Sequence, residues 1–192
     1  DIGGKTMIER VVRQVQKSRA RAVVVATDDM RVADVVRAFG GEVCMTSAQH
    51  PSGTDRIEEV ARLMGYGADD IIVNVQGDEP LIPPDNIILV AANLAARPDC
   101  SAATLCEPLL LLAEVFNPNI VKLVRDVNDF ALYFSRAPMP WARDAFAKDK
   151  SVLPALDVYF RHLGIYAYRV GFLHAYVGWP PAVIEQVEAL EQ

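Results

Sequence analysis

The sequence has few of the features that mark secreted, disulfide-bonded or membrane proteins. Only 3 cysteines occur, Cys44, Cys100 and Cys106, and they sit in apolar stretches without a CxxC spacing, so no disulfide framework is expected. The chain has no run of about 18 apolar residues and no basic leader before an apolar core. These absences predict a cytoplasmic protein with buried thiols, no secretory signal and no contact with a membrane.

Positive charge is also scarce. The 19 Lys and Arg residues are outnumbered by 25 Asp and Glu residues, which gives a net charge of -6, and they are scattered along the chain. A surface for nucleic acid needs a basic stripe or patch, so no nucleic-acid partner is expected, although one anionic small molecule can still bind. No G-x-G-x-x-G follows a strand, which disfavours a dinucleotide-dependent dehydrogenase.

Apolar residues make up 52% of the chain, which is enough to fill a substantial core. Its distribution predicts helices that alternate with strands, typical of a mostly parallel sheet with right-handed crossovers. The expected strands are residues 22–27, 42–45, 71–75 and 102–106. The expected helices are residues 7–15, 30–39 and 83–94, together with a helix that residues 52–56 lead into and that carries Ile57, Val60, Ala61 and Met64.

The second half of the chain has a different pattern. Two apolar segments flank a turn of polar residues and predict a β-hairpin over residues 120–134. Residues 138–158 are rich in proline and charge and predict a long loop, residues 161–169 alternate polar with apolar and predict a strand, and residues 181–192 predict a helix.

The stretch most informative about function is residues 71–80, where an apolar run stops at an amide, a glycine and two carboxylates. We expect a strand buried on both faces, and in an open α/β sheet the loop after such a strand binds ligands. Asp78, with Glu79 beside it, offers the oxygen ligands that Mg²⁺ prefers. The same residues are common turn formers, so a plain turn is the alternative at this point.

Other polar residues have simpler interpretations. A helix that begins near Ser52 offers free backbone N–H groups and a positive dipole end to an anion or a base edge. Asp28 and Asp29 are interpreted as helix caps, and Glu185 and Glu188 as solvated carboxylates of the last helix.

Three motifs together resemble a known family. The segments VNVQGDEP (73–80), HPSGTDR (50–56) and RHLGIY (161–166) are similar to those of the 3-deoxy-manno-octulosonate cytidylyltransferases, or CMP-Kdo synthetases. The resemblance runs over residues 1–192 and includes shorter matches at residues 26–28, 116–118, 133–136 and 190–192.

The resemblance implies a fold: an α/β, Rossmann-like three-layer sandwich of the nucleotide-diphospho-sugar transferase kind, with a mostly parallel sheet. A single nucleotidyltransferase domain would cover residues 1–192, and residues 120–160 would form a hairpin insertion used in dimerisation. It also implies two segments outside this sequence. One is an upstream strand whose loop grips the CTP phosphates, and the other contains downstream strands with a further metal-binding carboxylate.

The implied activity is the formation of CMP-Kdo and pyrophosphate from CTP and 3-deoxy-D-manno-octulosonate (Kdo), for lipopolysaccharide biosynthesis, with Mg²⁺ as cofactor. By resemblance Asp78 binds the metal ion and acts in catalysis with Gln76. The residues implied to contact CTP are Ser52, Gly53, Thr54 and Arg56. Those implied to contact Kdo are Gln76, Arg136, His162, Tyr166, Glu191 and Gln192.

The expected partners are the two small-molecule substrates and a second copy of the chain, joined through residues 120–141. Two alternatives to this function stay open. One is transfer of the cytidylyl group to another sugar acid, such as a sialic acid. The other is a nucleotide-binding or assembly subunit without turnover.

Overall fold

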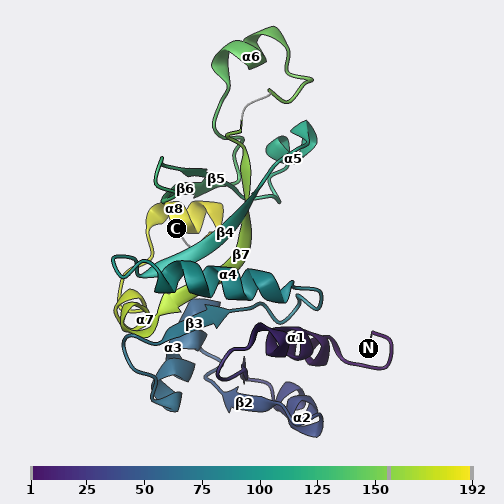
Figure 1. Cartoon of the computed structure of the whole chain (residues 1–192), viewed down its shortest axis with the longest axis vertical. Coiled ribbons are helices and arrows are strands. Elements are labelled where there is room, and N and C mark those ends of the chain that lie inside the picture. The colour runs from purple at the N-terminus through teal and green to yellow at the C-terminus, as the bar shows by residue number, and fades with distance from the viewer. Residues whose placement is uncertain (1, 155–156, 191–192) are drawn as a thin grey trace. The chain divides into compact units, whose positions relative to one another are not determined.

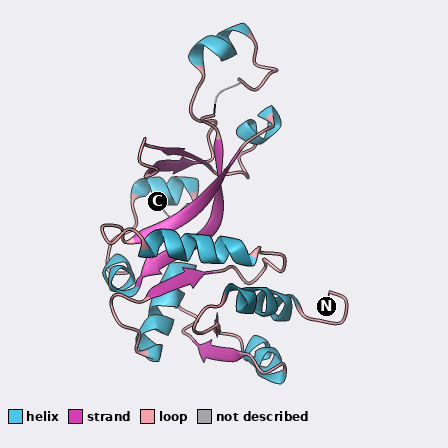
Figure 2. Ribbon diagram, viewed as in Figure 1, coloured by secondary structure: helices cyan, strands magenta, loops and turns pink. Residues whose placement is uncertain are grey.

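A computed structural model describes residues 2–154 and 157–190 of the chain (Figure 1). Glu191 and Gln192, which the resemblance assigns to Kdo, therefore lie outside the described residues. The chain divides into two compact units, residues 1–104 with 165–179, and residues 105–164 with 180–192. Both units contain helices and strands, so the expected α/β class is confirmed (Figure 2).

The first unit alternates helix and strand largely as the sequence predicts. Its elements are α1 (Met7–Val15), a 3₁₀ turn η1 (Gln16–Ser18), β1 (Val24–Thr27), α2 (Met30–Ala38), β2 (Glu42–Met45), α3 (Gly53–Met64), β3 (Ile71–Asn74), α4 (Pro84–Ala95) and α7 (Val170–Tyr176). It also holds the start of β4 (Ala102–Pro108) and the end of β7 (Phe160–Arg169). The short helix α7 has no counterpart among the sequence predictions.

Strand pairing in this unit is mixed, which corrects the expectation of a mostly parallel sheet. β1 and β2 are parallel, with Val24 opposite Glu42. β3 is antiparallel to β7, with Ile71 opposite Arg169 and Asn74 opposite Tyr166. β7 follows β3 in the chain only after the second unit, and it runs in the direction opposite to β3. The pair therefore has antiparallel hydrogen bonding and not the parallel pairing that a crossover connection gives.

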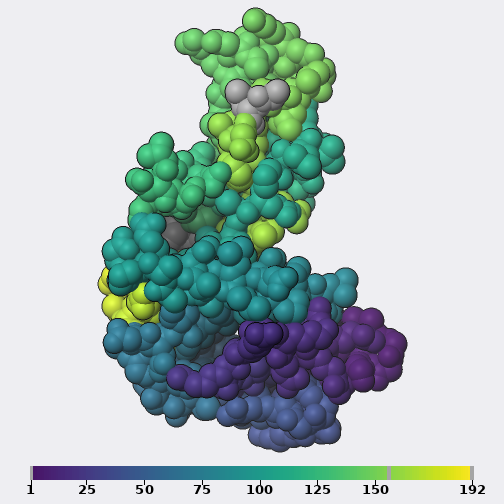
Figure 3. Space-filling view, viewed as in Figure 1, coloured from purple at the N-terminus to yellow at the C-terminus, as the bar shows by residue number. Residues whose placement is uncertain are grey.

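The core of the first unit follows from the spacing of its apolar residues. Val12 of α1, Val25 of β1 and Val36 of α2 are buried together. α1 also packs beside α4, where the purple and teal segments touch in the space-filling view (Figure 3). Each helix with one apolar stripe is thus buried along that stripe and exposed on its opposite, polar face.

A cavity of about 660 Å³ lies between β1 and β3, lined by apolar residues of both strands and of α1 and α4. Among the described strands, β1 pairs only with β2, and β3 only with β7. Residues 71–74 are consequently half-buried rather than buried on both faces, which corrects that expectation.

The second unit contains the predicted hairpin, formed by β5 (Lys122–Arg125) and β6 (Ala131–Ser135). The Asp126 carboxylate closes its turn by accepting hydrogen bonds from the N–H groups of Asn128 (2.8 Å) and Phe130 (2.9 Å). β5 also pairs antiparallel with the start of β7. A buried cluster packs around α5 (Leu112–Phe116) and α6 (Arg143–Lys148): Leu109, Val115, Phe146 and Tyr159.

Two sequence predictions in this unit need correction. α6 lies within residues 138–158, which were expected to form a loop. The last helix, α8, spans only Val183–Glu188 instead of continuing to residue 192, because Ala189 adopts a left-handed conformation (φ 50°) that ends it.

The cysteines correct the expectation of three buried thiols. All three cysteines are free thiols, but only Cys44 is buried, whereas Cys100 and Cys106 are half-buried. Over residues 2–154 and 157–190, no helix has the length and apolar character to cross a membrane.

Candidate active site

The first turn of α3 carries three of the residues assigned to CTP. Ser52 is the N-cap: its hydroxyl accepts a hydrogen bond from the Asp55 N–H (3.2 Å) and donates one to the Asp55 carboxylate (2.6 Å). A Cβ on Gly53 would have no neighbour within 4 Å, so the backbone there is open to a ligand. Thr54 points inward and is only 2% exposed. The turn therefore presents backbone at Gly53, while the Ser52 hydroxyl caps the helix and Thr54 is buried.

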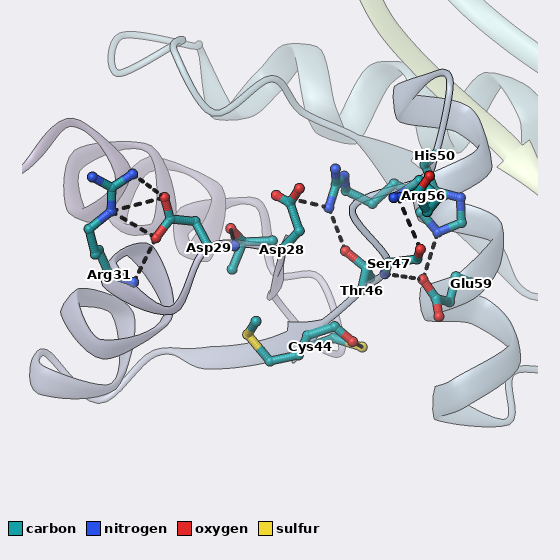
Figure 4. Close-up of polar contacts among 12 residues, drawn as sticks. Asp28, Asp29, Arg31, Cys44, Thr46, Ser47, His50, Arg56 and Glu59 are labelled. Carbon is teal, nitrogen blue, oxygen red and sulfur yellow. Dashed lines mark hydrogen bonds and ion pairs between the residues drawn. The ribbon is translucent and has the colours of Figure 1, made fainter.

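Arg56, the fourth of these residues, reaches back to the ends of two strands (Figure 4). Its Nη1 donates to the Thr46 hydroxyl (2.6 Å) and lies 3.4 Å from an Asp28 carboxylate oxygen. Asp28 and Thr46 directly follow β1 and β2, so the guanidinium lies at the carboxyl ends of parallel strands, where α/β proteins bind ligands. The interpretation of Asp28 as a cap is wrong, whereas Asp29 does cap α2.

A carboxylate that the sequence did not single out anchors the loop before α3. One oxygen of Glu59 accepts a hydrogen bond from the Ser47 N–H (2.8 Å) and lies 2.6 Å from His50 Nε2 (Figure 4). The hydrogen bond with His50 is the main reason that the pKa of Glu59 is lowered. Glu59 thus fixes both ends of the segment that leads into Ser52. Its spacing of nine residues from His50 gave no motif.

The polar end of β3 is open to solvent. Gln76, Gly77, Asp78 and Glu79 are all exposed, and the Glu79 N–H donates to the Gln76 carbonyl (3.3 Å) to form a turn. Gln76 and Gly77 line the cavity beside β3, which Gly53 lines as well. The structure therefore brings the end of β3 and the start of α3 to one cavity, as the sequence motifs predict for a nucleotide site.

Asp78 has an exposed carboxylate that could hold a metal ion. Its carboxylate makes no hydrogen bond or ion pair with another described residue, and it borders a second pocket formed by residues 78–83. Within residues 2–154 and 157–190, no group of three His, Cys, Asp or Glu side chains is placed to hold a metal. A single exposed carboxylate fits Mg²⁺, which takes its other ligands from phosphate oxygens and water.

Tyr166 belongs to the same part of the first unit. It lies opposite Asn74 across the β3–β7 pair, and Asn74 is two residues before Gln76 in the chain. Its ring stacks on that of Tyr168 at 5.5 Å and an angle of 6°. The pairing of β3 with β7 thus brings Tyr166 to the polar end of β3, which no local sequence pattern indicates.

His162 and Arg136 belong to the second unit. The His162 ring meets Phe134 edge to face, with 4.8 Å between ring centres. Burial lowers the pKa of His162 to about 4, so the imidazole is neutral near pH 7. A neutral imidazole can donate one hydrogen bond and accept one, which suits a sugar hydroxyl.

Arg136 directly follows β6 and is held by main-chain oxygens. Its Nε donates to the Glu188 carbonyl (2.7 Å) and its Nη1 to the Pro118 carbonyl (3.0 Å). No carboxylate of the described residues forms an ion pair with this guanidinium. The guanidinium is therefore oriented by main-chain carbonyls, and the same contacts attach Arg136 to the segment that precedes residues 191–192.

Glu188 is the main correction to the side-chain interpretations in this unit. The sequence suggests a solvated carboxylate, but Glu188 accepts hydrogen bonds from Tyr133, Ser135 and the Arg136 N–H. The Arg136 N–H is the first cause of its lowered pKa. The acidic spacing of α8 gave no sign of this, because the partners lie more than fifty residues away in sequence.

The predicted site residues therefore divide between the two units. The first unit holds Ser52, Gly53, Thr54, Arg56, Gln76, Asp78 and Tyr166, and the second holds Arg136 and His162.

Known proteins resemble this chain over its whole length. The family described as Cytidylyltransferase matches residues 1–192. The 3-deoxy-manno-octulosonate cytidylyltransferase of Pseudomonas syringae pv. tomato is 57% identical over 191 residues, which cover 100% of this chain and 75% of that protein. The protein of the same name from Alcanivorax borkumensis is 58% identical over 192 residues, covering 100% and 76%.

A solved structure gives the same result for the fold. CMP:2-keto-3-deoxy-manno-octonic acid synthetase complexed with CTP is similar with a TM-score of 0.89 and 41% identity, covering 100% of this chain and 75% of that one.

Proposed function

Because this chain belongs to the cytidylyltransferase family, we propose that it makes CMP-Kdo and pyrophosphate from CTP and Kdo. Relatives more than half identical over the full chain bear the name of this activity. The observation that carries the proposal is the cavity shared by Gly53 at the start of α3 and Gln76 at the end of β3. The nucleotide would lie at the end of this cavity that Gly53, Gln76 and Gly77 line, where the backbone N–H groups of α3 and the end of β3 meet, and not between β1 and β3 themselves.

In this proposal the cytidine part of CTP lies along the first turn of α3. Gly53 allows close approach to the backbone, and Ser52 and Thr54 hold the turn in shape through the N-cap and through packing. Arg56 is held by Thr46 and Asp28, so its remaining N–H groups have a fixed direction toward the ligand.

The reaction is an in-line displacement. The anomeric hydroxyl oxygen of Kdo forms a bond to the α-phosphorus of CTP, the bond from that phosphorus to the β-phosphate oxygen breaks, and the hydroxyl proton passes to water. Pyrophosphate leaves with the bonding electrons. The protein supplies no nucleophile, and its contribution is to position the two substrates and balance charge.

Asp78 would hold Mg²⁺ in this site. When bound, the metal ion withdraws charge from the phosphate oxygens and favours attack at the α-phosphorus. Gln76, an exposed amide two residues earlier, would hydrogen-bond the sugar acid.

Arg136 supplies the charge that recognises a sugar acid. Its guanidinium can bind a carboxylate with two parallel hydrogen bonds, and no described carboxylate competes for it. His162 and Tyr166 would hydrogen-bond the hydroxyl groups of Kdo. Glu191 and Gln192 remain predictions for the same substrate.

The domain organisation is also a proposal. We infer that the upstream strand implied by the family resemblance occupies the cavity between β1 and β3, because both strands have a free edge there among the described residues. The homodimer and the cytoplasmic location stay predictions.

The test is turnover by the full-length gene product. Purified protein is mixed with CTP, Mg²⁺ and either Kdo or N-acetylneuraminic acid, and both pyrophosphate and the CMP-sugar are measured. Turnover with Kdo and little with the sialic acid is expected. Preference for the sialic acid would show that it, and not Kdo, is the sugar-acid substrate. CTP binding without turnover of either acid would favour the non-catalytic alternative.

A further inference from the structure

Lys122, at the start of β5, is a buried cation whose partners are all main-chain carbonyl groups. Its side chain is 0% exposed, and its ammonium donates to the carbonyl oxygens of Asn117 (2.8 Å), Ile120 (2.6 Å) and Arg136 (2.7 Å). An ammonium has three N–H groups, so its hydrogen-bonding capacity is filled. These contacts tie the end of β6 to residues 117–120.

Burying the Lys122 ammonium is energetically unfavourable. Burial is the first reason that the pKa of Lys122 is lowered, and no described carboxylate forms an ion pair with it. A buried charge without an opposite charge is unfavourable unless its contacts compensate. One of the three oxygens that it holds is the carbonyl of Arg136.

Glu188 holds the same residue through different atoms. One carboxylate oxygen accepts the Arg136 N–H (2.8 Å), and the other accepts the hydroxyls of Ser135 (2.7 Å) and Tyr133 (3.0 Å). The Glu188 main-chain oxygen accepts Nε of Arg136 (2.7 Å). Between them, Lys122 and Glu188 fix the N–H, the C=O and the guanidinium of Arg136.

We propose that Lys122 and Glu188 are positioning residues that hold Arg136 in the one orientation that binds the carboxylate of the sugar acid. An arginine side chain is long and flexible, and a two-pronged contact needs its plane in a fixed direction. With Nε, Nη1 and Nη2 held by the carbonyls of Glu188, Pro118 and Ala189, the remaining N–H bonds of the guanidinium present a fixed face.

This inference rests on the proposed role of Arg136, and it makes a prediction that a merely structural role does not. Loss of positioning weakens the contact with one substrate only. A loss of general stability lowers the amount of active enzyme and leaves the KM values for both substrates unchanged. The ratio of the two KM values therefore separates these explanations.

The experiment measures both KM values in the full-length gene product. Glu188→Ala is expected to raise the KM for Kdo about tenfold, the scale for loss of a charge-assisted hydrogen bond, and to leave the KM for CTP within about twofold. Glu188→Gln should restore most of the loss, because an amide oxygen can accept the Arg136 N–H while its NH₂ donates to the two hydroxyls. Gln186→Ala, an exposed change on the same helix, is the control.

The second variant is Lys122→Met, which keeps the length of the side chain and removes its donors. It should raise the KM for Kdo in the same selective way, and Lys148→Met, at an exposed position of α6, should not. If Lys122→Met fails to fold, the Glu188 variants decide the matter by themselves.

A double-mutant cycle links the effect to Arg136. Arg136→Ala alone should raise the KM for Kdo at least as much as Glu188→Ala, and combining the two should add little, since both act through one guanidinium. Additive effects, or unchanged KM for Kdo in Glu188→Ala beside a large rise in Arg136→Ala, would overturn the inference. No effect of Arg136→Ala would instead refute the role proposed for Arg136 itself.

Discussion

At the scale of single residues, the carboxylate of Asp78 differs from those that accept hydrogen bonds from the protein. Asp29, Glu59 and Glu188 each accept several hydrogen bonds that shape the protein. The Asp78 carboxylate has no such partner among the described residues, although it ends the most informative motif of the sequence. A carboxylate left free at a strand end is available to a ligand.

Asp78→Asn is therefore expected to cut turnover at least ~100-fold while leaving the fold intact, because the amide keeps the shape but lacks the charge that holds a metal ion. The measurements are kcat with CTP and Kdo and the thermal unfolding midpoint. Asp69→Asn, at an exposed position in the loop before β3, serves as the matched control. A near-normal rate in Asp78→Asn would contradict the metal-binding role.

His162 gives a prediction about pH. Its folded-state pKa of about 4 lies below the ordinary value of 6.5, so between these values the unfolded state binds the extra proton. Stability should consequently fall as the pH drops from 7 to 5, by on the order of 1 kcal/mol because the ring is only partly shielded from water.

The measurement is urea unfolding at both pH values, in the natural chain and in His162→Gln, which does not titrate in this range. The variant should lose less free energy of unfolding between pH 7 and pH 5. Equal losses in the two proteins would show that the imidazole is not desolvated as the structure has it.

At the scale of elements, the loop before α3 depends on a residue within the helix. Glu59 receives the Ser47 N–H and contacts His50, so residues 46–52 are fastened to α3 at two points. Its neighbour Glu58 contacts His174 of α7 instead. Adjacent carboxylates thus serve a loop and a helix pair, respectively.

Glu59→Ala is expected to raise the KM for CTP several-fold, because the loop that leads into Ser52 loses its anchor, and to lower the thermal unfolding midpoint slightly through loss of the contacts with Ser47 and His50. Glu58→Ala is the comparison, since it should affect stability without raising the KM for CTP. Initial rates at varied CTP concentration measure the effect. Equal KM values in the two variants would argue against an anchoring role for Glu59.

At the scale of the whole molecule, one open feature is the cavity of about 660 Å³ between β1 and β3. Edge strands with free N–H and C=O groups readily pair with another strand. The proposal that an upstream strand occupies this place connects the domain organisation to the nucleotide site, since Gln76 and Gly53 line the same cavity.

Hydrogen exchange measures this directly. Backbone amides of β1 and β3 should exchange at least ~10-fold more slowly in the full-length gene product than in a protein limited to residues 1–192, because a paired strand protects them. The hairpin of β5 and β6 should exchange alike in both, as an internal control. Equal exchange at β1 and β3 would mean that the cavity is not the place of an added strand.

The sequence by itself determined many of the elements and the residue types at the proposed nucleotide site. Apolar periodicity located α1, α2, α3 and the hairpin because the pattern is local: each residue's neighbours in the chain are its neighbours in the element. The segments 50–56 and 73–80 likewise predicted a helix start and a strand end, which are local features, and their resemblance to a known family assigned a nucleotide to them.

Only the tertiary structure decided how distant segments meet. The antiparallel pairing of β3 with β7, which brings Tyr166 opposite Asn74, joins residues more than ninety apart. The hydrogen bonds of Lys122 to main-chain carbonyls and the contacts of Glu188 join β5, β6 and α8 in the same way. A lysine in an apolar strand and a glutamate on a short helix look unremarkable in sequence, because burial and hydrogen-bond partners are properties of packing.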